Sequence, residues 1–153
     1  MLKKIVLGLV IITSLVSCKK DCSYNACAVV APASEIQAVQ SYLSANGIAA
    51  VQHCSGLFYV IEQMGSGKKP SACNTVNTTY VGKLTNGSVF DQGTVSFGLD
   101  EVIRGWTNGI PLIKKGGTIH LYIPPSLGYG SQANGPIPGN SILIFDVTLN
   151  DVE

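Results

Sequence analysis

The chain has 153 residues, enough for one domain with a hydrophobic core and little more. Charged residues make up only 12% of it and the formal net charge is +1, so no nucleic-acid-binding surface and no strongly basic membrane patch is expected. The 17 glycines and 7 prolines indicate many turns, as in a fold rich in β-structure.

The first residues predict an export signal rather than part of the fold. Lys3 and Lys4 precede the apolar run IVLGLVII, which is too short to span a bilayer and has the length of a signal-peptide core. The following LVSC, residues 15–18, resembles the lipobox of bacterial lipoproteins. We therefore expect residues 1–17 to be removed and Cys18 to carry a lipid. The alternative is an ordinary signal peptide that happens to contain a cysteine.

A lipid on Cys18 would anchor the protein to the bacterial cell envelope without spanning the membrane. The expected location is therefore the periplasmic side or the cell surface. Residues 18–33 show no sustained hydrophobic period and are expected to form a tether.

Four further cysteines are expected to form two disulfides, because an even number of thiols in an exported chain favours oxidation. They are Cys22, Cys27, Cys54 and Cys73. Three connectivities are possible, and the sequence does not choose between them. A zinc site is the alternative. No Cys-x-x-Cys pair is present, however, and the nearby imidazole of His53 is adjacent to Cys54 and poorly placed to share an ion with it, so no metal is expected.

An N-terminal extension, residues 34–53, is predicted to contain one helix. Ser34 and Gln37 have the spacing of a capping box, and Asn46-Gly47 is a suitable C-terminal stop. Between them apolar residues recur at helical spacing, at Ile36, Val39 and Leu43. The pattern predicts an amphipathic helix over residues 34–46 that packs on the main domain, residues 54–153.

From Gly56 onward the sequence is typical of β-structure, and Asn86-Gly87 predicts a hairpin turn. The segment RGWTNGIPLI, residues 104–113, indicates a single short helix with Pro111 at its end, because proline brings no backbone N–H. Such a pattern belongs to the α+β class. The strands expected are residues 56–65, 75–84, 88–90, 94–99, 117–123 and 140–149.

The sequence shows no motif for hydrolytic, phosphate-binding or metal chemistry: it has no Gly-x-Ser-x-Gly, no P-loop and no pair of histidines at ligand spacing. His53 and His120 stand alone and are expected to be surface or strand residues. The second half contains a set of aromatic residues instead, for which one aromatic-rich core is the simplest interpretation. These are Tyr80, Phe90, Phe97, Trp106, Tyr129 and Phe145.

Four segments resemble, in order, the successive motifs of the FKBP-type peptidyl-prolyl cis-trans isomerases. They are YVGKLTNGSVFD, VIRGW, IPPSLGYG and SILIFDVTL, and the resemblance runs from about Gly56 to Glu153. It implies an antiparallel sheet of five or six strands wrapped around one short helix, with a pocket between them. It also implies an enzyme that catalyses rotation about X–Pro bonds in exported proteins and so assists folding. The alternative is a non-catalytic proline-peptide binding module or chaperone on the same fold.

The resemblance also assigns roles to residues. Trp106 would form the pocket floor under the substrate proline ring, Tyr129 would donate its hydroxyl to a substrate carbonyl, and Asp91 would lie beside the twisting imide. The backbone N–H of Ile103 would bind another carbonyl. Rotation about X–Pro needs no nucleophile, so no cofactor is expected. The remaining substrate-binding candidates are Tyr80, Phe90, Phe97, Val102, Ile137 and Phe145. The partners implied are proline-containing polypeptides and macrolide inhibitors.

The chain departs from the family pattern at one segment. Six residues separate Phe90 from Phe97, where the family usually has a longer, bulged segment, often with an arginine that pairs with the aspartate. No arginine is present there, so the partner of Asp91 stays open. Val95 stands where many members carry another aromatic residue, and that wall of the pocket is expected to be more open. The loop 131–139 is too short for an inserted chaperone domain.

Overall fold

The computed structural model describes residues 22–153. The predicted leader, residues 1–17, and the predicted lipidation site, Cys18, lie outside the described residues. Within residues 22–153, no helix is both long and apolar enough to cross a membrane. The elements, in chain order, are α1 (Ala33–Ala45), β1 (Val51–Gln52), β2 (Phe58–Gln63), β3 (Thr75–Lys83), β4 (Val89–Gly98), α2 (Arg104–Gly109), the 3-10 turn η1 (Ile110–Leu112), β5 (Thr118–Ile123), the 3-10 turn η2 (Pro125–Leu127) and β6 (Leu143–Val152).

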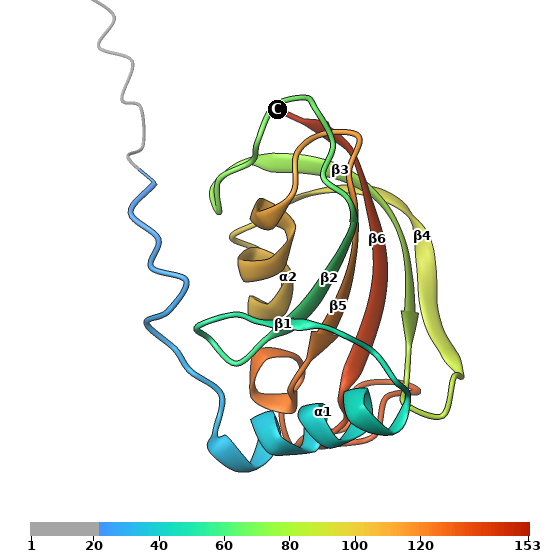
Figure 1. Ribbon diagram of the computed structural model, residues 1–153. Coiled ribbons are helices and arrows are strands. Elements are labelled where there is room, and N and C mark those ends of the chain that lie inside the picture. Colours follow the sequence, from blue (N-terminus) through green and yellow to red (C-terminus); the bar gives the residue numbers. More distant parts are fainter. Residues whose placement is uncertain (1–21) are drawn as a thin grey trace, which may run out of the picture.

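The strands form one sheet in the order β1-β2-β5-β6-β3-β4, and every neighbouring pair is antiparallel. The sheet curves around α2, which lies on its concave side (Figure 1). Helix α1 packs on the opposite side, where its Val39 and Leu43 join a second apolar cluster with Phe58, Tyr122 and Ile144. The prediction of an α+β fold, with a sheet around one short helix and an additional N-terminal helix, is confirmed.

Alternation along β5 explains why both faces of the sheet carry apolar clusters. Ile119, Leu121 and Ile123 point into the main core beside α2, whereas Tyr122 points to the α1 side. A strand covered on both faces reads as a nearly continuous apolar run, and LYI at the end of β5 has that character.

Helix α2 approaches β5 closely because glycines face the strand. A Cβ on Gly105 would lie 2.5 Å from Ile123 Cδ1, and a Cβ on Gly109 would lie 2.6 Å from Leu121 Cδ2. The two glycines are one helical turn apart and therefore lie on the same face of α2. Trp106, between them in sequence, points toward the β3–β4 side of the core and is only 6% exposed.

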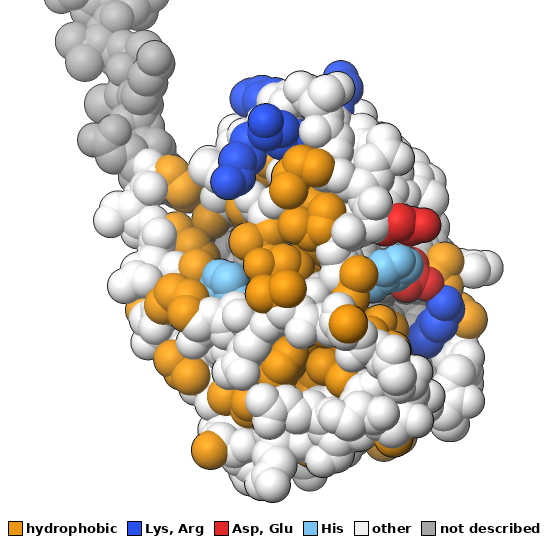
Figure 2. Space-filling model, in the orientation of Figure 1, with side chains coloured by type: hydrophobic (Ala, Val, Ile, Leu, Met, Phe, Trp, Pro, Cys, Tyr) orange, Lys and Arg blue, Asp and Glu red, His pale blue; other side chains and the backbone are white. Residues whose placement is uncertain are grey.

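His120 lies on β5, as expected of a strand residue, and takes part in a charged network on the α1 side of the sheet. Its Nδ1 is 2.6 Å from Asp146 Oδ1, and Lys83 Nζ donates to Asp146 Oδ2 at 2.6 Å. Partial burial alone would raise the pKa of Asp146, but the hydrogen bonds from Lys83 and His120 outweigh it and lower the pKa. Figure 2 shows one histidine beside acidic and basic side chains on the right of this face, and a separate group of basic side chains along its upper edge.

Several local predictions need correction. The capping box is wrong: α1 begins one residue earlier, after Pro32, and no side-chain oxygen caps it. The reason is that Pro32 already sets an extended entry, and the chain before it is held by the bond from Ala31 N to Ser55 O. The helix expected over 104–113 is shorter: α2 ends at Gly109 and η1 follows it, with Pro111 at the edge of the helix as predicted, because proline cannot donate to an α-helical ladder. Residues 88–90 and 94–99 belong to one continuous strand, β4.

The predicted disulfides are present and join Cys22 to Cys73 and Cys27 to Cys54. Together with the bond from the Tyr24 hydroxyl to Asn108 Oδ1 at 2.6 Å, they attach the first described residues to the domain. Ligand atoms of Cys27, His53 and Cys54 lie within 4.8 Å of one another. Both sulfurs belong to the disulfide, however, so neither is available as the thiolate that a metal would require.

We expect no free thiol among these four cysteines in protein isolated without reductant. Thiol titration in denaturant should give no reaction before reduction, and the serine double variant at Cys22 and Cys73 should lose about 2–4 kcal/mol of stability. The matched control is the serine double variant at Cys27 and Cys54. The sequence separation of these two cysteines is 27, against 51 for Cys22 and Cys73, so their bridge closes a shorter loop. Two or more reactive thiols per chain before reduction would contradict the assignment.

Candidate active site

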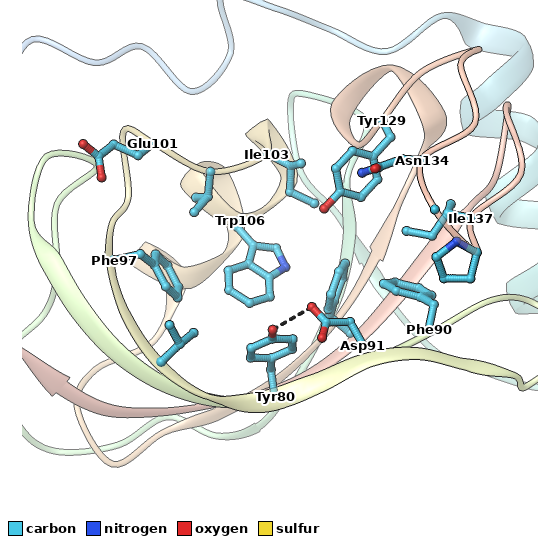
Figure 3. A pocket seen from close by; sticks show the side chains of 15 residues that line it. Tyr80, Phe90, Asp91, Phe97, Glu101, Ile103, Trp106, Tyr129, Asn134 and Ile137 are labelled. Carbon is cyan, nitrogen blue, oxygen red and sulfur yellow. Dashed lines mark hydrogen bonds between the residues drawn. The ribbon is translucent and has the colours of Figure 1, made fainter.

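A cavity of about 520 Å³ opens between α2, the β3–β4 side of the sheet and the loop that follows β5. Figure 3 shows its side chains converging from these separate elements. The structure brings together every side chain predicted for the site. The lining includes Tyr80, Phe90, Asp91, Phe97, Val102, Ile103, Trp106, Tyr129, Ile137 and Phe145.

Phe90 and Asp91 both line the cavity although they are neighbours in sequence, which a regular strand does not allow. The cause is a bulge. Lys83 pairs with Val89 and Gly82 pairs with Asp91, so Phe90 is one extra residue on β4. The bulge turns one aromatic ring and one carboxylate toward the same space.

Gly82 makes room for the rings at this point. A Cβ there would lie 2.7 Å from the Phe90 ring and 2.8 Å from the Phe145 ring. Phe90 and Phe145 pack edge-to-face with centroids 5.5 Å apart. A larger residue at position 82 would therefore displace one wall of the cavity.

Trp106 forms the floor, and three rings hold its indole in place. Ring centroids lie 5.0 Å away for Tyr80, 5.1 Å for Phe97 and 5.0 Å for Phe145, with tilted or edge-to-face geometry. Within the described chain, the buried Nε1 of Trp106 has no hydrogen-bond acceptor. In Figure 3 this nitrogen lies on the side of the ring toward Asp91 and Tyr129. The floor is thus apolar at its surface, with one unpaired donor buried in it.

The partner of Asp91 is Tyr80, whose hydroxyl donates to Asp91 Oδ2 at 2.7 Å. Partial burial, and then the hydrogen bond and negative charge of Asp91, raise the pKa of Tyr80 to about 12. Partial burial and the Asp91 charge also raise the pKa of Tyr129, which is 42% exposed at the cavity mouth. Both phenols are therefore neutral donors near neutral pH. The Tyr80 hydroxyl already donates to Asp91, whereas the Tyr129 hydroxyl has no hydrogen-bond partner among the described residues.

Some lining residues were not predicted as site residues. Val95, noted for its position in the wall, lines the cavity and is 42% exposed. Glu101 lies at the rim, and nothing in its sequence context indicates that position. Asn134, Gly135 and Pro136 form a tight turn closed by reciprocal backbone bonds between Asn134 and Ile137. The Asn-Gly-Pro sequence is a turn signal, but it does not show where the turn will pack.

Comparison with known proteins bears directly on this site. Residues 66–150 match the family model for the FKBP-type peptidyl-prolyl cis-trans isomerase. The chain belongs to this family. A probable FKBP-type isomerase of Haemophilus influenzae is 52% identical over 104 residues, and the protein FkpA of Escherichia coli is 46% identical over 104 residues. These matches cover 64% and 65% of this FKBP-type chain but only 43% and 38% of the relatives.

Solved structures agree with the assignment. The crystal structure of FkpA from Escherichia coli has a TM-score of 0.70 and 40% identity, and the match covers 79% of this chain and 58% of that one. The crystal structure of AtFKBP13 has a TM-score of 0.64 and 33% identity, covering 69% of this chain and 99% of that one. AtFKBP13 thus corresponds to the domain alone, whereas this chain spans less than half the length of the curated relatives named above.

The Tyr80–Asp91 pair predicts a pH dependence of stability. The pKa of Tyr80 rises from 10.0 to about 12 on folding. The stability that its neutral form contributes is therefore complete below pH 10.0 and is lost as the pH approaches 12. Urea titrations should show a smaller loss of stability across this range for Tyr80→Phe than for the wild type. Other tyrosines ionise in both proteins, so equal losses would show that folding does not raise the pKa of Tyr80.

Proposed function

We propose that this domain catalyses the cis-trans isomerisation of X–Pro bonds in exported polypeptides and thereby assists their folding. The observation that carries the proposal is the cavity over Trp106, in which an aromatic floor, the Tyr80–Asp91 pair and the Tyr129 hydroxyl meet in a member of this family. The cavity fits a small apolar ring with amide groups on either side. That is the shape of a prolyl residue within an extended chain.

The chemistry requires no bond to be made or broken. Amide resonance gives rotation about a peptide bond a barrier of about 18–20 kcal/mol, and the twisted imide has less charge separation than the planar one. In the proposed complex the proline ring rests on Trp106 between Tyr80, Phe97 and Phe145. An apolar surface binds the twisted form better than the planar form, which lowers the barrier.

Polar groups at the rim hold the flanking carbonyls while the imide rotates. Tyr129 would donate from the mouth, and the backbone N–H of Ile103 would donate from the start of α2, where helical N–H groups lack partners within the helix. Asp91, held by Tyr80, is a polar contact for the twisting imide rather than a general base.

Macrolide inhibitors of this family and proline-containing polypeptides are the ligands proposed for the cavity. The rival function is a non-catalytic module that binds prolyl peptides in the same cavity. The two functions differ in turnover, not in binding, so an isomerisation assay separates them.

Purified protein should accelerate isomerisation of a prolyl peptide in a protease-coupled assay. Tyr129→Phe should lower kcat/KM by up to about tenfold, since one hydrogen bond contributes about 0.5–1.5 kcal/mol. Trp106→Leu should lower kcat/KM further, because the flat floor is lost, and Asp91→Leu should reduce activity more than stability. Tyr24→Phe is the matched control: it removes a phenol that bonds Asn108 outside the cavity.

Binding can be followed independently, because the chain contains a single tryptophan. A prolyl peptide or a macrolide should change the emission of Trp106. A change in emission without any turnover would support the binding module instead. An unchanged emission at saturating ligand would remove Trp106 from the site.

We also propose that the chain is exported and lipid-anchored through Cys18, with residues 18–33 as the tether, 34–53 as the extension and 54–153 as the catalytic domain. The lipobox-like LVSC after a basic and apolar leader supports the anchor. The two disulfides support an oxidising compartment. Residues 22–27 of the proposed tether are nevertheless attached to the domain through Cys22 and Cys27.

The anchor predicts that the protein, expressed in a bacterium that processes lipoproteins, partitions into detergent and incorporates labelled fatty acid. Cys18→Ser should abolish both, because the thiol is the site of lipid attachment. The matched control is Ser17→Ala, which leaves that thiol in place. Fatty-acid labelling that survives in Cys18→Ser would show that the lipid, if any, is attached elsewhere.

A further inference from the structure

We propose that the free edge of β4 binds the client polypeptide as an added β-strand, next to the cavity that holds its proline. This inference rests on the proposed function and specifies how the same site takes a long substrate. β4 is the last strand of the sheet and has 10 residues, and among the described residues no strand pairs with its outer side (Figure 1). The opposite edge of the sheet, β1, has only 2 residues.

The backbone groups that face this edge can be identified from one hydrogen bond. Leu99 N–H donates to Asn74 O at 3.0 Å, immediately beyond the pair formed by Thr75 and Gly98. In an antiparallel ladder, residues alternate between bonding the partner strand and facing away from it. From Leu99 backward along β4, the backbone N–H and C=O groups that bond β3 therefore belong to every second residue: Phe97, Val95 and Gly93. Those that face the free edge belong to Gln92, Thr94 and Ser96.

The same alternation places the cavity beside the edge. Asp91, Val95 and Phe97 line the cavity, so their side chains point to the concave face while the neighbouring residues offer N–H and C=O groups outward. An added strand would lie about 4.8 Å from β4. A chain whose proline rests on Trp106 leaves the cavity across this rim, which brings its next residues within reach of the edge. The client is therefore the occupant that the geometry favours.

Beyond the bulge at Phe90, the edge lacks the features that normally prevent strand addition. Native proteins protect edges with lysine, proline or short strands. From Gln92 to Gly98 the strand contains no charged residue and no proline, and Val95 is 42% exposed. The nearest charges are the carboxylates of Asp91 and Glu101, which line the same cavity, and that of Asp100, whose Oδ1 would lie 2.7 Å from a Cβ on Gly98. The edge therefore suits extended, uncharged or basic client segments and disfavours acidic ones.

The test compares a short prolyl peptide, which fills only the cavity, with a long unfolded one that extends several residues on both sides of proline. Thr94→Pro removes one outward N–H and keeps the ladder to β3, a change that edge strands tolerate. Thr94→Ala is the matched control: it removes the same hydroxyl, which bonds Thr79 Oγ1 at 2.8 Å, but keeps the N–H.

We expect Thr94→Pro to lower kcat/KM for the long peptide by about three- to tenfold, the effect of losing one hydrogen bond, and to leave the short peptide unchanged. Thr94→Ala should behave as the wild type with both peptides. In the wild type, the long peptide but not the short one should slow hydrogen exchange at the amides of Gln92, Thr94 and Ser96. The exchange measurement decides the question even if the proline variant does not fold.

Equal losses for both peptides, or unprotected amides at saturating long peptide, would overturn the proposal. Protection that appears without peptide and grows with protein concentration would also overturn it, because the edge would then belong to a second copy of the chain. Failure of the isomerase function is a separate outcome: the wild type would not turn over even the short peptide. Even in a protein without turnover, the hydrogen-exchange experiment would still test strand addition.

Discussion

Helix α2 rests on β5 with glycine at both positions where the two backbones approach, and a single Cβ at Gly105 or Gly109 would lie within 2.6 Å of Ile123 or Leu121. That spacing sets the depth of the cavity. Trp106 lies between the glycines in sequence, so any displacement of the helix from β5 moves the indole relative to the rings that surround it. The floor of the site is therefore positioned by atoms on the far side of the helix, which never contact a ligand.

The order of motifs along the chain was enough to predict the fold and ten of the fifteen residues that line the cavity. It worked because each motif contributes between one and three residues to a common space: three at VIRGW and one at IPPSLGYG. What it did not predict depends on pairing across strands. The Tyr80–Asp91 bond requires the register of β3 against β4 and the bulge at Phe90, neither of which can be read from a single segment.

Other features that the sequence did not predict also depend on contacts between segments that are distant in the sequence. The choice of Cys22–Cys73 and Cys27–Cys54 among three connectivities depends on where the first described residues cross the domain. The capping box at Ser34 satisfied a local pattern, but Pro32 and the bond between Ala31 and Ser55 determine where the helix begins. The six residues between Phe90 and Phe97 were noted as short for the family, and their consequence is a strand without interruption. Local patterns are reliable where no distant contact competes with them.

The disulfide from Cys22 to Cys73 limits how far the domain can lie from a lipid attached to Cys18. Cys22 is four residues after Cys18, and four extended residues reach at most about 14 Å. A lipid on Cys18 would thus keep the domain almost against the bilayer surface, and only clients passing through that thin layer would meet the cavity. Reduction of this one disulfide would make Cys27, nine residues from Cys18, the first covalent attachment, and would extend the reach to about 30 Å wherever the hydrogen bond from Tyr24 to Asn108 also breaks. The redox state of a bond remote from the cavity would then set the volume around the anchor that the cavity can reach.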